Sequence, residues 1–246
     1  MRSRTWILLP TCTVVLLLAY SGAVTSGYFS DVETSTDNVL RVKNAPLFGA
    51  ADSFLILASS TISNDGSTTV GSVAAPGDIG LYPGTEVTGY VDIVHYGTLH
   101  LTDTVADQAQ TDLTTAYGDA ALRTPSTTLT VLDGLELGPG VYHGETLALT
   151  GTLTLTGGEN AVWIFQTEST LVTAGSSHVV LSGGARAANV YWVVKSSATL
   201  GANSTFKGNI MALASITMNT GATVEGRALA QTAAVTLNGN TITRPA

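Results

Sequence analysis

The chain has 246 residues, of which 44% are hydrophobic and only 11% are charged, and its formal net charge is −8. This length suits one large domain. The high apolar content and the small number of charges argue against a disordered chain. The acidic balance argues against a nucleic-acid partner, because binding phosphates needs a basic stripe. The composition therefore indicates a folded protein that does not bind nucleic acid.

The N-terminus, residues 1–26, has the pattern of an export signal. Arg2 and Arg4 supply the positive start, and a mostly apolar run follows from Trp6 to Ala19. A retained membrane anchor is the alternative, but the run is shorter than the roughly 20 residues that a membrane span needs. The only cysteine, Cys12, lies inside this segment. The exported protein is therefore expected to lack disulfides, cysteine-bound metals and cysteine nucleophiles.

Residues 27–44 are polar and acidic and are predicted to be a leader tag or linker. The stretch Gly27-Tyr28-Phe29-Ser30-Asp31-Val32-Glu33-Thr34-Ser35 resembles a tag that follows the signal of proteins handled by a specialised signal peptidase. Some of those proteins are secreted fibre and matrix proteins. The tag strengthens the prediction of export, to the medium or to the cell surface, and names no activity. The folded domain is predicted to cover residues 45–246.

One helix is predicted at about residues 102–123. Apolar residues recur there every three or four positions, as expected for a helix with one buried face: Val105, Ala109, Leu113, Ala116 and Ala120. Thr102 or Asp103 can cap its start, and acidic residues in the first turn suit the positive end of the helix dipole. We expect this helix to lie lengthwise against the remainder of the domain.

The last third of the chain repeats one short strand in which a threonine precedes an aliphatic residue. Thr199, Thr217 and Thr236 are separated by 18 and 19 residues. A strand that recurs at a near-constant period of this length is typical of a β-solenoid, in which equivalent side chains of stacked coils form columns. The sequence therefore predicts an all-β fold built from such coils.

Each predicted coil has three kinds of strand. The first kind is apolar on successive residues, so both of its sides are expected to be buried, as in 162–165, 190–194, 210–213 and 228–230. The second kind alternates, with aliphatic residues inward and Ser, Thr or Asn outward, as in 215–219 and 234–238. The third kind carries charge, as in 205–207, 223–227 and 241–243. The predicted cross-section is three-sided: one side under the helix, one of small polar residues, and one with Lys207, Glu225 and Arg227 exposed.

These residues together resemble the microbial ice-binding proteins of the β-solenoid type (DUF3494-like), over roughly residues 45–245. The resemblance is carried by the helix before the late coils and by several motifs: Leu47-Phe48-Gly49-Ala50-Ala51-Asp52-Ser53, Gly77-Asp78-Ile79-Gly80, Leu137-Gly138-Pro139-Gly140-Val141-Tyr142, Asn189-Val190-Tyr191-Trp192 and Gly226-Arg227-Ala228-Leu229-Ala230. The resemblance implies a right-handed discontinuous β-helix, in which the first coil closes among later coils, with the helix alongside. It also implies ice binding through one flat face.

Some members of that family carry a Thr-(Ala/Gly)-x-(Thr/Asn) motif on the ice-binding face. Thr220-Gly221-Ala222-Thr223 matches this motif once, Thr173-Ala174-Gly175-Ser176 differs at its last position, and Leu200-Gly201-Ala202-Asn203 lacks the first threonine. The predicted ice-binding residues combine this match with the outward side of the alternating strands. They are Thr152, Thr154, Thr170, Ser197, Thr199, Ser215, Thr217, Asn219, Thr220, Gly221, Ala222, Thr223, Ala234, Thr236 and Asn238.

The chemistry of threonine on a flat sheet fits such a surface. Ice presents a regular, uncharged lattice without concavity, and a rigid sheet presents side chains on a regular grid. Threonine adds a hydroxyl and a methyl group, and its branched Cβ restricts χ1. Threonine is also simply a good strand residue, so the pattern by itself does not require a binding plane.

Signals for catalysis are weak. The four histidines, His95, His100, His143 and His178, are scattered, and neither a metal-binding H-E-x-x-H motif nor a G-x-S-x-G motif is present. A polysaccharide-acting β-helix would need clustered acidic or basic residues in a groove, and no such cluster is found. We therefore expect no enzyme activity, no cofactor, no metal and no small-molecule substrate.

Two functions remain open from the sequence. The first is a secreted, monomeric ice-binding protein that adsorbs to ice crystals and inhibits their growth and recrystallisation. The second is a non-catalytic adhesive or matrix module of the cell surface, which the leader tag favours.

Overall fold

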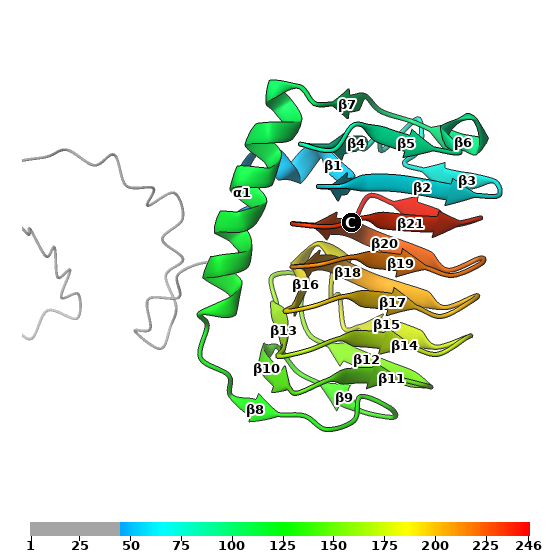
Figure 1. Cartoon of the computed structure of the whole chain (residues 1–246). Coiled ribbons are helices and arrows are strands. Elements are labelled where there is room, and N and C mark those ends of the chain that lie inside the picture. The colour runs from blue at the N-terminus through cyan, green and yellow to red at the C-terminus, as the bar shows by residue number, and fades with distance from the viewer. Residues whose placement is uncertain (1–44) are drawn as a thin grey trace, which may run out of the picture. The chain divides into compact units, whose positions relative to one another are not determined.

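A computed structural model describes residues 45–246, and the predicted signal peptide and leader tag lie outside the described residues. The strands stack in parallel coils with three faces, as Figure 1 shows. The flat face is a seven-stranded sheet made of β11 (Leu147–Leu149), β14 (Leu171–Thr173), β17 (Ala198–Leu200), β19 (Ile216–Met218), β21 (Val235–Asn238), β2 (Thr61–Asp65) and β5 (Glu86–Thr88).

The other two faces belong to one larger sheet, because two long strands bend from one face to the other. The second face contains β9 (Glu136–Leu137), β12 (Thr152–Thr156), β15 (His178–Ser182), the starts of β18 (Thr205–Ala212) and β20 (Thr223–Ala230), β22 (Thr241–Thr243), β3 (Thr68–Val70) and β6 (Ile93–His95). The helix-covered face contains β8 (Thr127–Thr128), β10 (Gly140–Gly144), β13 (Trp163–Thr167), β16 (Val190–Val194), the ends of β18 and β20, β1 (Phe54–Ala58), β4 (Asp78–Leu81) and β7 (Leu99–Leu101).

The order of the coils in space differs from their order in the chain. The first coil, β1 to β3, stacks on the last, β20 to β22: β1 pairs with β20, β2 with β21 and β3 with β22. We call this junction the seam. Helix α1 (Thr104–Ala121) then runs along the stack to the opposite end, where β8 starts the remaining coils, so the C-terminus lies in the middle of the stack (Figure 1). The predicted discontinuous β-solenoid is confirmed.

The corners between the flat face and the second face repeat one backbone conformation. In six coils the corner residue has a positive φ, between 55° and 82°, which reverses the chain tightly: Ser176, Asn203, Gly221, Gly239, Gly66 and Gly89. The short 3-10 helices η1 (Gly49–Ser53), η2 (Tyr90–Asp92) and η3 (Ala187–Asn189) complete the connections. Because the same turn recurs, the strands on either side keep their register from coil to coil.

The interior holds a ladder of aromatic rings. Trp192 is fully buried, stacks on Phe165 at 4.2 Å between ring centroids, and contacts Phe206 at 4.9 Å. Tyr142 continues the stack beyond Phe165 at 5.3 Å. Trp192 also donates its indole N–H to the carbonyl of Lys207 at 3.0 Å. The successive apolar residues of β13 and β16 are buried on both sides, as predicted, because α1 packs against their outer side.

Helix α1 has the predicted position but a slightly different buried stripe. Ala109, Leu113, Ala116 and Ala120 are buried as expected, whereas Val105 is 44% exposed and Ala106 takes its place in the contact. The prediction of Val105 was wrong because either the residue three positions or the residue four positions before Ala109 can lie on the buried side of a helix. Here the residue three positions before it, Ala106, faces the sheet, and Val105 does not. Small residues let the helix approach the sheet closely.

Asp103 caps α1, one of the two caps that the sequence suggests. Its side chain accepts hydrogen bonds from the backbone N–H of Val105 at 3.1 Å and of Ala106 at 2.8 Å. His100 Nδ1 lies 2.7 Å from its other carboxylate oxygen. The pKa of Asp103 lies below its ordinary value, mainly because of the hydrogen bond from the N–H of Ala106 and next because of the contact with His100. The ionised form is therefore the one that stabilises the helix start.

Replacing Asp103 by alanine is expected to lower the free energy of unfolding by about 0.5–1 kcal/mol at pH 7, because a capped N–H loses its partner. The effect is small since this carboxylate is 41% exposed and solvent screens it. Because folding lowers the pKa of Asp103, its ionised carboxylate stabilises the fold fully at pH values above the pKa of an unfolded aspartate, about 3.9. This stabilisation is lost as the pH falls through the lower pKa of the folded state. Urea unfolding at pH 7 and pH 3 measures both effects. Asp107→Ala, which removes a first-turn charge but no cap, should lower the free energy of unfolding clearly less than Asp103→Ala, and equal behaviour of the two variants would contradict the assignment.

Candidate functional site: the flat face

A column of small hydroxylated side chains runs across the centre of the flat face. The outward residues of its strands pair directly from coil to coil. In spatial order they are Ala148, Val172, Thr199, Thr217, Thr236, Ser63 and Thr88. The last five carry hydroxyls without interruption. The seam falls within these five, and Ser63 donates a hydrogen bond across it to the hydroxyl of Thr236 at 3.3 Å.

Two further columns flank the central one, two residues earlier and two residues later on each strand. The earlier column contains Thr170, Ser197, Ser215, Ala234, Thr61 and Glu86, and the later one contains Asn219, Asn238 and Asp65. Ser197 and Ser215 lie 3.0 Å apart, oxygen to oxygen. Most outward residues of the flat face thus carry a hydrogen-bonding group, and Ala148, Val172 and Ala234 do not. The predicted residues on these strands are brought together on one surface.

The spacing and rigidity of this surface follow from the sheet beneath it. Neighbouring strands lie about 4.7–4.9 Å apart, and outward residues two apart on one strand are about 6.6–6.8 Å apart. The inward residues Ile216, Met218 and Val235 are fully buried, so the strands rest on a packed core. The flat face therefore presents a two-dimensional grid of hydroxyls that has little freedom to rearrange.

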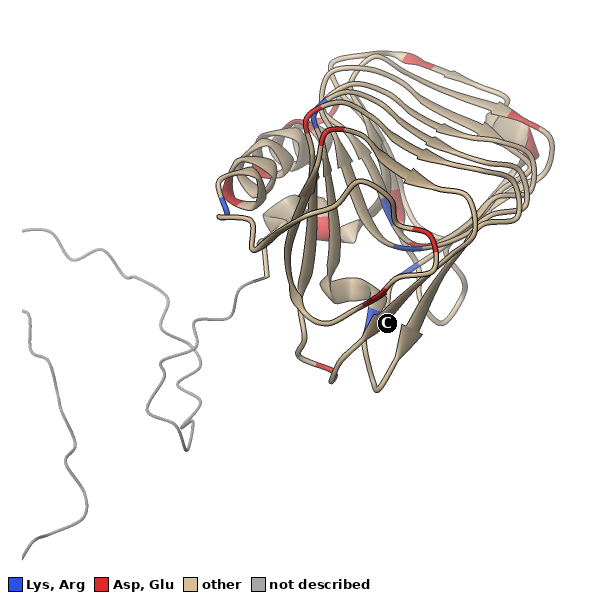
Figure 2. Ribbon diagram, turned by 90° about the horizontal axis from the view of Figure 1, so that it is seen from below, with Lys and Arg blue, Asp and Glu red and all other residues tan. Residues whose placement is uncertain are grey.

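The flat face carries little charge. Within their bounds, β11, β14, β17, β19 and β21 contain no Lys, Arg, Asp or Glu, and the two acidic residues of this sheet, Asp65 and Glu86, lie on β2 and β5 at one end. In Figure 2 the strands of this face are almost entirely tan, whereas the coloured residues gather at corners and on other parts of the molecule. A partner of this surface must accordingly be recognised by shape and hydrogen bonding rather than by ion pairs.

The structure corrects the placement of Thr152 and Thr154. Both lie on β12, which pairs with β15 in the larger sheet, so they face outward from the second face. There Thr152 is in register with His178, and the column continues through Thr205, Thr223, Thr241 and Thr69. The prediction was wrong because both exposed faces alternate in the same way, and only the intervening corner tells them apart.

The motif Thr220-Gly221-Ala222-Thr223 forms a corner instead of a segment of the flat face. Gly221 has φ +70°, Ala222 is fully buried, and Thr223 points outward on the second face. Thr220 is exposed at the corner itself. Predicting all four residues for one surface was therefore wrong, because a residue with positive φ turns the chain through the corner within the motif.

Arg227 is also placed differently from its prediction. It was expected on the exposed charged face, but it is 4% exposed and holds the seam. Its guanidinium donates to the Asp52 carboxylate at 2.6 Å and to Asn209 Oδ1 at 2.8 Å, and it lies 5.1 Å from the centre of the Phe48 ring. Burial lowers its pKa, and the Asp52 carboxylate opposes that shift. Lys207 and Glu225 do lie on the second face and pair at 2.6 Å.

Three hydroxyl-bearing residues of the flat face were missed in the sequence: Thr61, Ser63 and Thr88. The sequence does contain a pattern that could have predicted Thr61 and Ser63. The segment Thr61-Ile62-Ser63-Asn64-Asp65-Gly66 has the same Gly turn as Ala234-Val235-Thr236-Leu237-Asn238-Gly239 and a similar alternation, with Asn64 in the place of Leu237. It was overlooked because the two segments are far apart in the chain, and their pairing depends on the seam.

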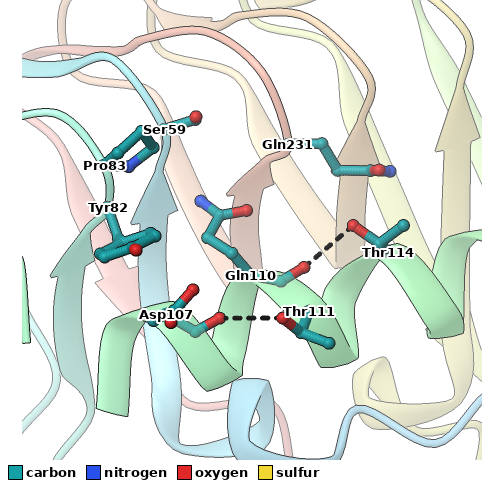
Figure 3. A pocket seen from close by; sticks show the side chains of 8 residues that line it. All are labelled: Ser59, Tyr82, Pro83, Asp107, Gln110, Thr111, Thr114 and Gln231. Carbon is teal, nitrogen blue, oxygen red and sulfur yellow. Dashed lines mark hydrogen bonds between the residues drawn. The ribbon is translucent and has the colours of Figure 1, made fainter. Parts of the chain in front are cut away.

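A hollow of about 240 Å³ lies beside α1 at the seam, and its lining is largely polar (Figure 3). It is smaller than the roughly 300–1,000 Å³ of typical ligand pockets. Thr111 and Thr114 direct their hydroxyls to backbone carbonyls of their own helix, and Gln110 donates to the carbonyl of Ala230 at 3.3 Å. Much of the lining is therefore already engaged within the protein.

The histidines remain apart in the fold. Over residues 45–246 there is no group of three or more His, Cys, Asp or Glu side chains that could hold a metal ion. His95 contacts the Tyr90 hydroxyl at 3.0 Å and the Gly77 carbonyl at 2.9 Å, which accounts for both of its ring nitrogens. In the same part of the chain, no helix has the length and apolar character that crossing a membrane requires.

Comparison with known proteins connects this geometry to a family. The model of the family described as "Ice-binding-like" matches residues 56–243. An ice-binding protein of Nostoc sp. (strain HG1) is 41% identical over 220 residues, which cover 87% of this chain and 78% of that protein. An ice-binding protein of Flavobacterium frigoris (strain PS1) is 36% identical over 80% of this chain and 75% of that protein.

Solved structures similar to this fold are also those of ice-binding proteins. A crystal structure of an ice-binding protein from an Antarctic biological consortium is 44% identical, has a TM-score of 0.78, and covers 82% of this chain and 92% of its own. One from the Antarctic ascomycete Antarctomyces psychrotrophicus is 40% identical with a TM-score of 0.76, over 81% and 98% of the two chains. The resemblance and the fold class predicted from the sequence are thereby confirmed. The chain belongs to the Ice-binding-like family.

Proposed function

We propose that this protein is an exported, non-catalytic ice-binding protein that adsorbs to ice as a monomer through its flat face. The observation that carries the proposal is the uninterrupted column of hydroxyls from Thr199 to Thr88, which lies on a nearly uncharged, rigid sheet. The names of its relatives support the same function. Thr170, Ser197, Ser215 and Asn219 widen the proposed surface on both sides.

The proposed mechanism is adsorption by many weak contacts made together. A net hydrogen bond contributes only about 0.5–1.5 kcal/mol, so no single hydroxyl binds ice firmly. Because the sheet is already ordered, little conformational entropy is lost on binding, and the small contributions add along the plane. A charged side chain in the plane would have to be desolvated, which opposes adsorption. Ice covered at many points by such a protein grows more slowly.

The proposal is tested by measuring thermal hysteresis and ice-crystal morphology on the purified chain without its predicted signal peptide. We expect a gap between melting and freezing points, faceted crystals, and inhibition of recrystallisation. Round crystals that grow freely at high protein concentration would contradict ice binding. That result would favour the alternative of an adhesive or matrix module, for which self-association and cell-surface attachment would be measured.

A further inference from the structure

The seam interrupts the flat face at its most regular part. Ser63 and Thr236 are neighbours in the hydroxyl column although 173 residues separate them in the chain. Strands β2 and β5 therefore contribute Ser63 and Thr88 only if the first coil docks on the last coil in one particular register. A two-residue shift of these coils would put Thr61 and Glu86 into the column in one direction, or Asp65 in the other, in place of Ser63 and Thr88.

Backbone hydrogen bonds alone do not select that register. A parallel ladder can form equally well after a shift of two residues, because the same side chains still face inward. Such a shift would move Ser63 about 6.6–6.8 Å along the strand and out of line with Thr236. Arg227 and Asp52 bind each other across the seam on the helix-covered face. Beside the flat face, a second side-chain interaction that works in only one alignment would exclude the shift there.

A chain of buried polar side chains supplies such an interaction under the corner of the flat face. Thr68 and Asn240, on opposite sides of the seam, are 0% and 1% exposed. The backbone N–H of Asn240 donates to the Thr68 hydroxyl at 3.0 Å, and that hydroxyl donates to Asn64 Oδ1 at 2.6 Å.

The chain continues to the coils on both sides. Asn64 Nδ2 donates to the carbonyl of Gly89 at 3.1 Å, which ties in the coil of β5. Asn240 Nδ2 donates to the carbonyls of Asn219 at 2.9 Å and Ala222 at 3.2 Å, in the coil of β19. Asn240 Oδ1 accepts the N–H of Asn238 at 2.6 Å. Four successive coils are thus linked.

The same corner position in coils away from the seam has no such link. Ladder bonds place Ser177, Ser204 and Ala222 in line with Asn240 and Thr68. Ser177 donates its hydroxyl within its own turn, to Ala174, and Ala222 has no polar side-chain group. Among the described residues, the Ser204 hydroxyl has no hydrogen-bond partner. The Thr68 hydroxyl, in contrast, takes part in a bond that crosses the seam, where the chain itself does not enforce the stacking.

We infer that Asn240, Thr68 and Asn64 are positioning residues that hold the first two coils in register and so complete the ice-contacting plane. This inference rests on the proposed function of the flat face. A buried polar group can fix the register of two strands, because any other alignment leaves the group without a hydrogen-bond partner. None of these three side chains needs to touch ice to affect adsorption.

The first test is Thr68→Val, which keeps the shape of the side chain and removes its hydroxyl. We expect a folded protein whose melting temperature falls by about 3–10 °C and whose adsorption to ice weakens about tenfold, because two hydroxyls leave the column.

Thr68→Ser should retain adsorption. Ser204→Ala, in the same corner column, should behave like wild type. Full adsorption by Thr68→Val, or equal loss in Thr68→Ser, would overturn the inference. If Thr68→Val does not fold, Asn64→Ala, at a half-buried position, replaces it.

A double-mutant cycle separates positioning from general destabilisation. If the link acts through the first coils, Thr88→Ala should have little further effect on adsorption in the Thr68→Val background, whereas Thr199→Ala should keep its full effect there. Full additivity of Thr68→Val with Thr88→Ala would contradict the inference.

Hydrogen exchange gives a readout that does not involve ice. Thr68→Val should exchange faster at the amides of β2 and β5 but not at those of β17, and unchanged exchange would overturn the inference. If the wild-type protein does not adsorb to ice, the proposed function fails, and the exchange data still decide whether the link holds the register.

Discussion

Replacing Thr217 by tyrosine is expected to lower adsorption to ice by about tenfold or more while leaving the fold intact. Thr217 lies in the middle of the hydroxyl column, between Thr199 and Thr236. A tyrosine ring would project beyond its neighbours and hold them away from the ice surface, so two or three weak contacts are lost together. Thermal hysteresis and partition of the protein into growing ice measure the loss, and circular dichroism checks the fold.

Thr223→Tyr is the matched control. Thr223 belongs to the next strand of the chain, is similarly half-buried, and sits in a threonine column between Thr205 and Thr241, but on the second face. It should retain adsorption. Loss in the control but not in Thr217→Tyr would move the site to the second face, and full adsorption by both variants would place it elsewhere on the molecule.

Replacing Trp192 by alanine is expected to lower the free energy of unfolding by about 3–5 kcal/mol, which is the usual cost of truncating a large buried aromatic residue. Trp192 is fully buried between Phe165 and Phe206, and alanine would leave a cavity in the ladder and an unpaired carbonyl at Lys207. For a chain of this size, the melting temperature should fall by about 6–20 °C. Thermal unfolding and urea titration check the value.

Two variants test the cause of that loss. Trp192→Phe keeps an aromatic ring in the stack and loses the bond to Lys207, so it should cost clearly less than alanine. Val180→Ala, on the second face where Val180 is 42% exposed, should change stability by less than about 0.5 kcal/mol. If Trp192→Ala were no more destabilising than Val180→Ala, the aromatic ladder would not be the core that its burial indicates.

Much of the architecture could be predicted from the sequence because it depends on local pattern. Successive apolar residues at 190–194 require burial on both sides, and the threonines at 199, 217 and 236 recur at the length of one coil. The stripe of Ala109, Leu113 and Ala116 predicts a helix that packs closely, and Asp103 has the chemistry of its cap. Each of these features is decided within about twenty residues of sequence.

The composition of the face was harder to predict, because it depends on corners and on long-range pairing. Thr154 and Thr217 sit in similar alternating strands, and only the corner after Thr150 carries Thr154 to another face. Arg227 follows Glu225 at a spacing of two, but β20 bends at Gly226 (φ +155°), so the arginine lies on the helix-covered face. There it is buried against Phe48 and Asp52. Ser63 joins the flat face only through the seam.

The seam also has a consequence for the order in which the protein folds. The chain that directly follows the first coil pairs with only one of its edges, because β5 binds one side of β2. The other side of β2 finds its partner β21 only after residue 238 has been made. Coils from β10 onward can stack as they emerge, since each pairs with the next. Contacts of such long sequence separation form slowly. Closure of the stack is therefore expected to be the last step of folding and to take place after synthesis, with the C-terminal coil entering a gap between two preformed neighbours.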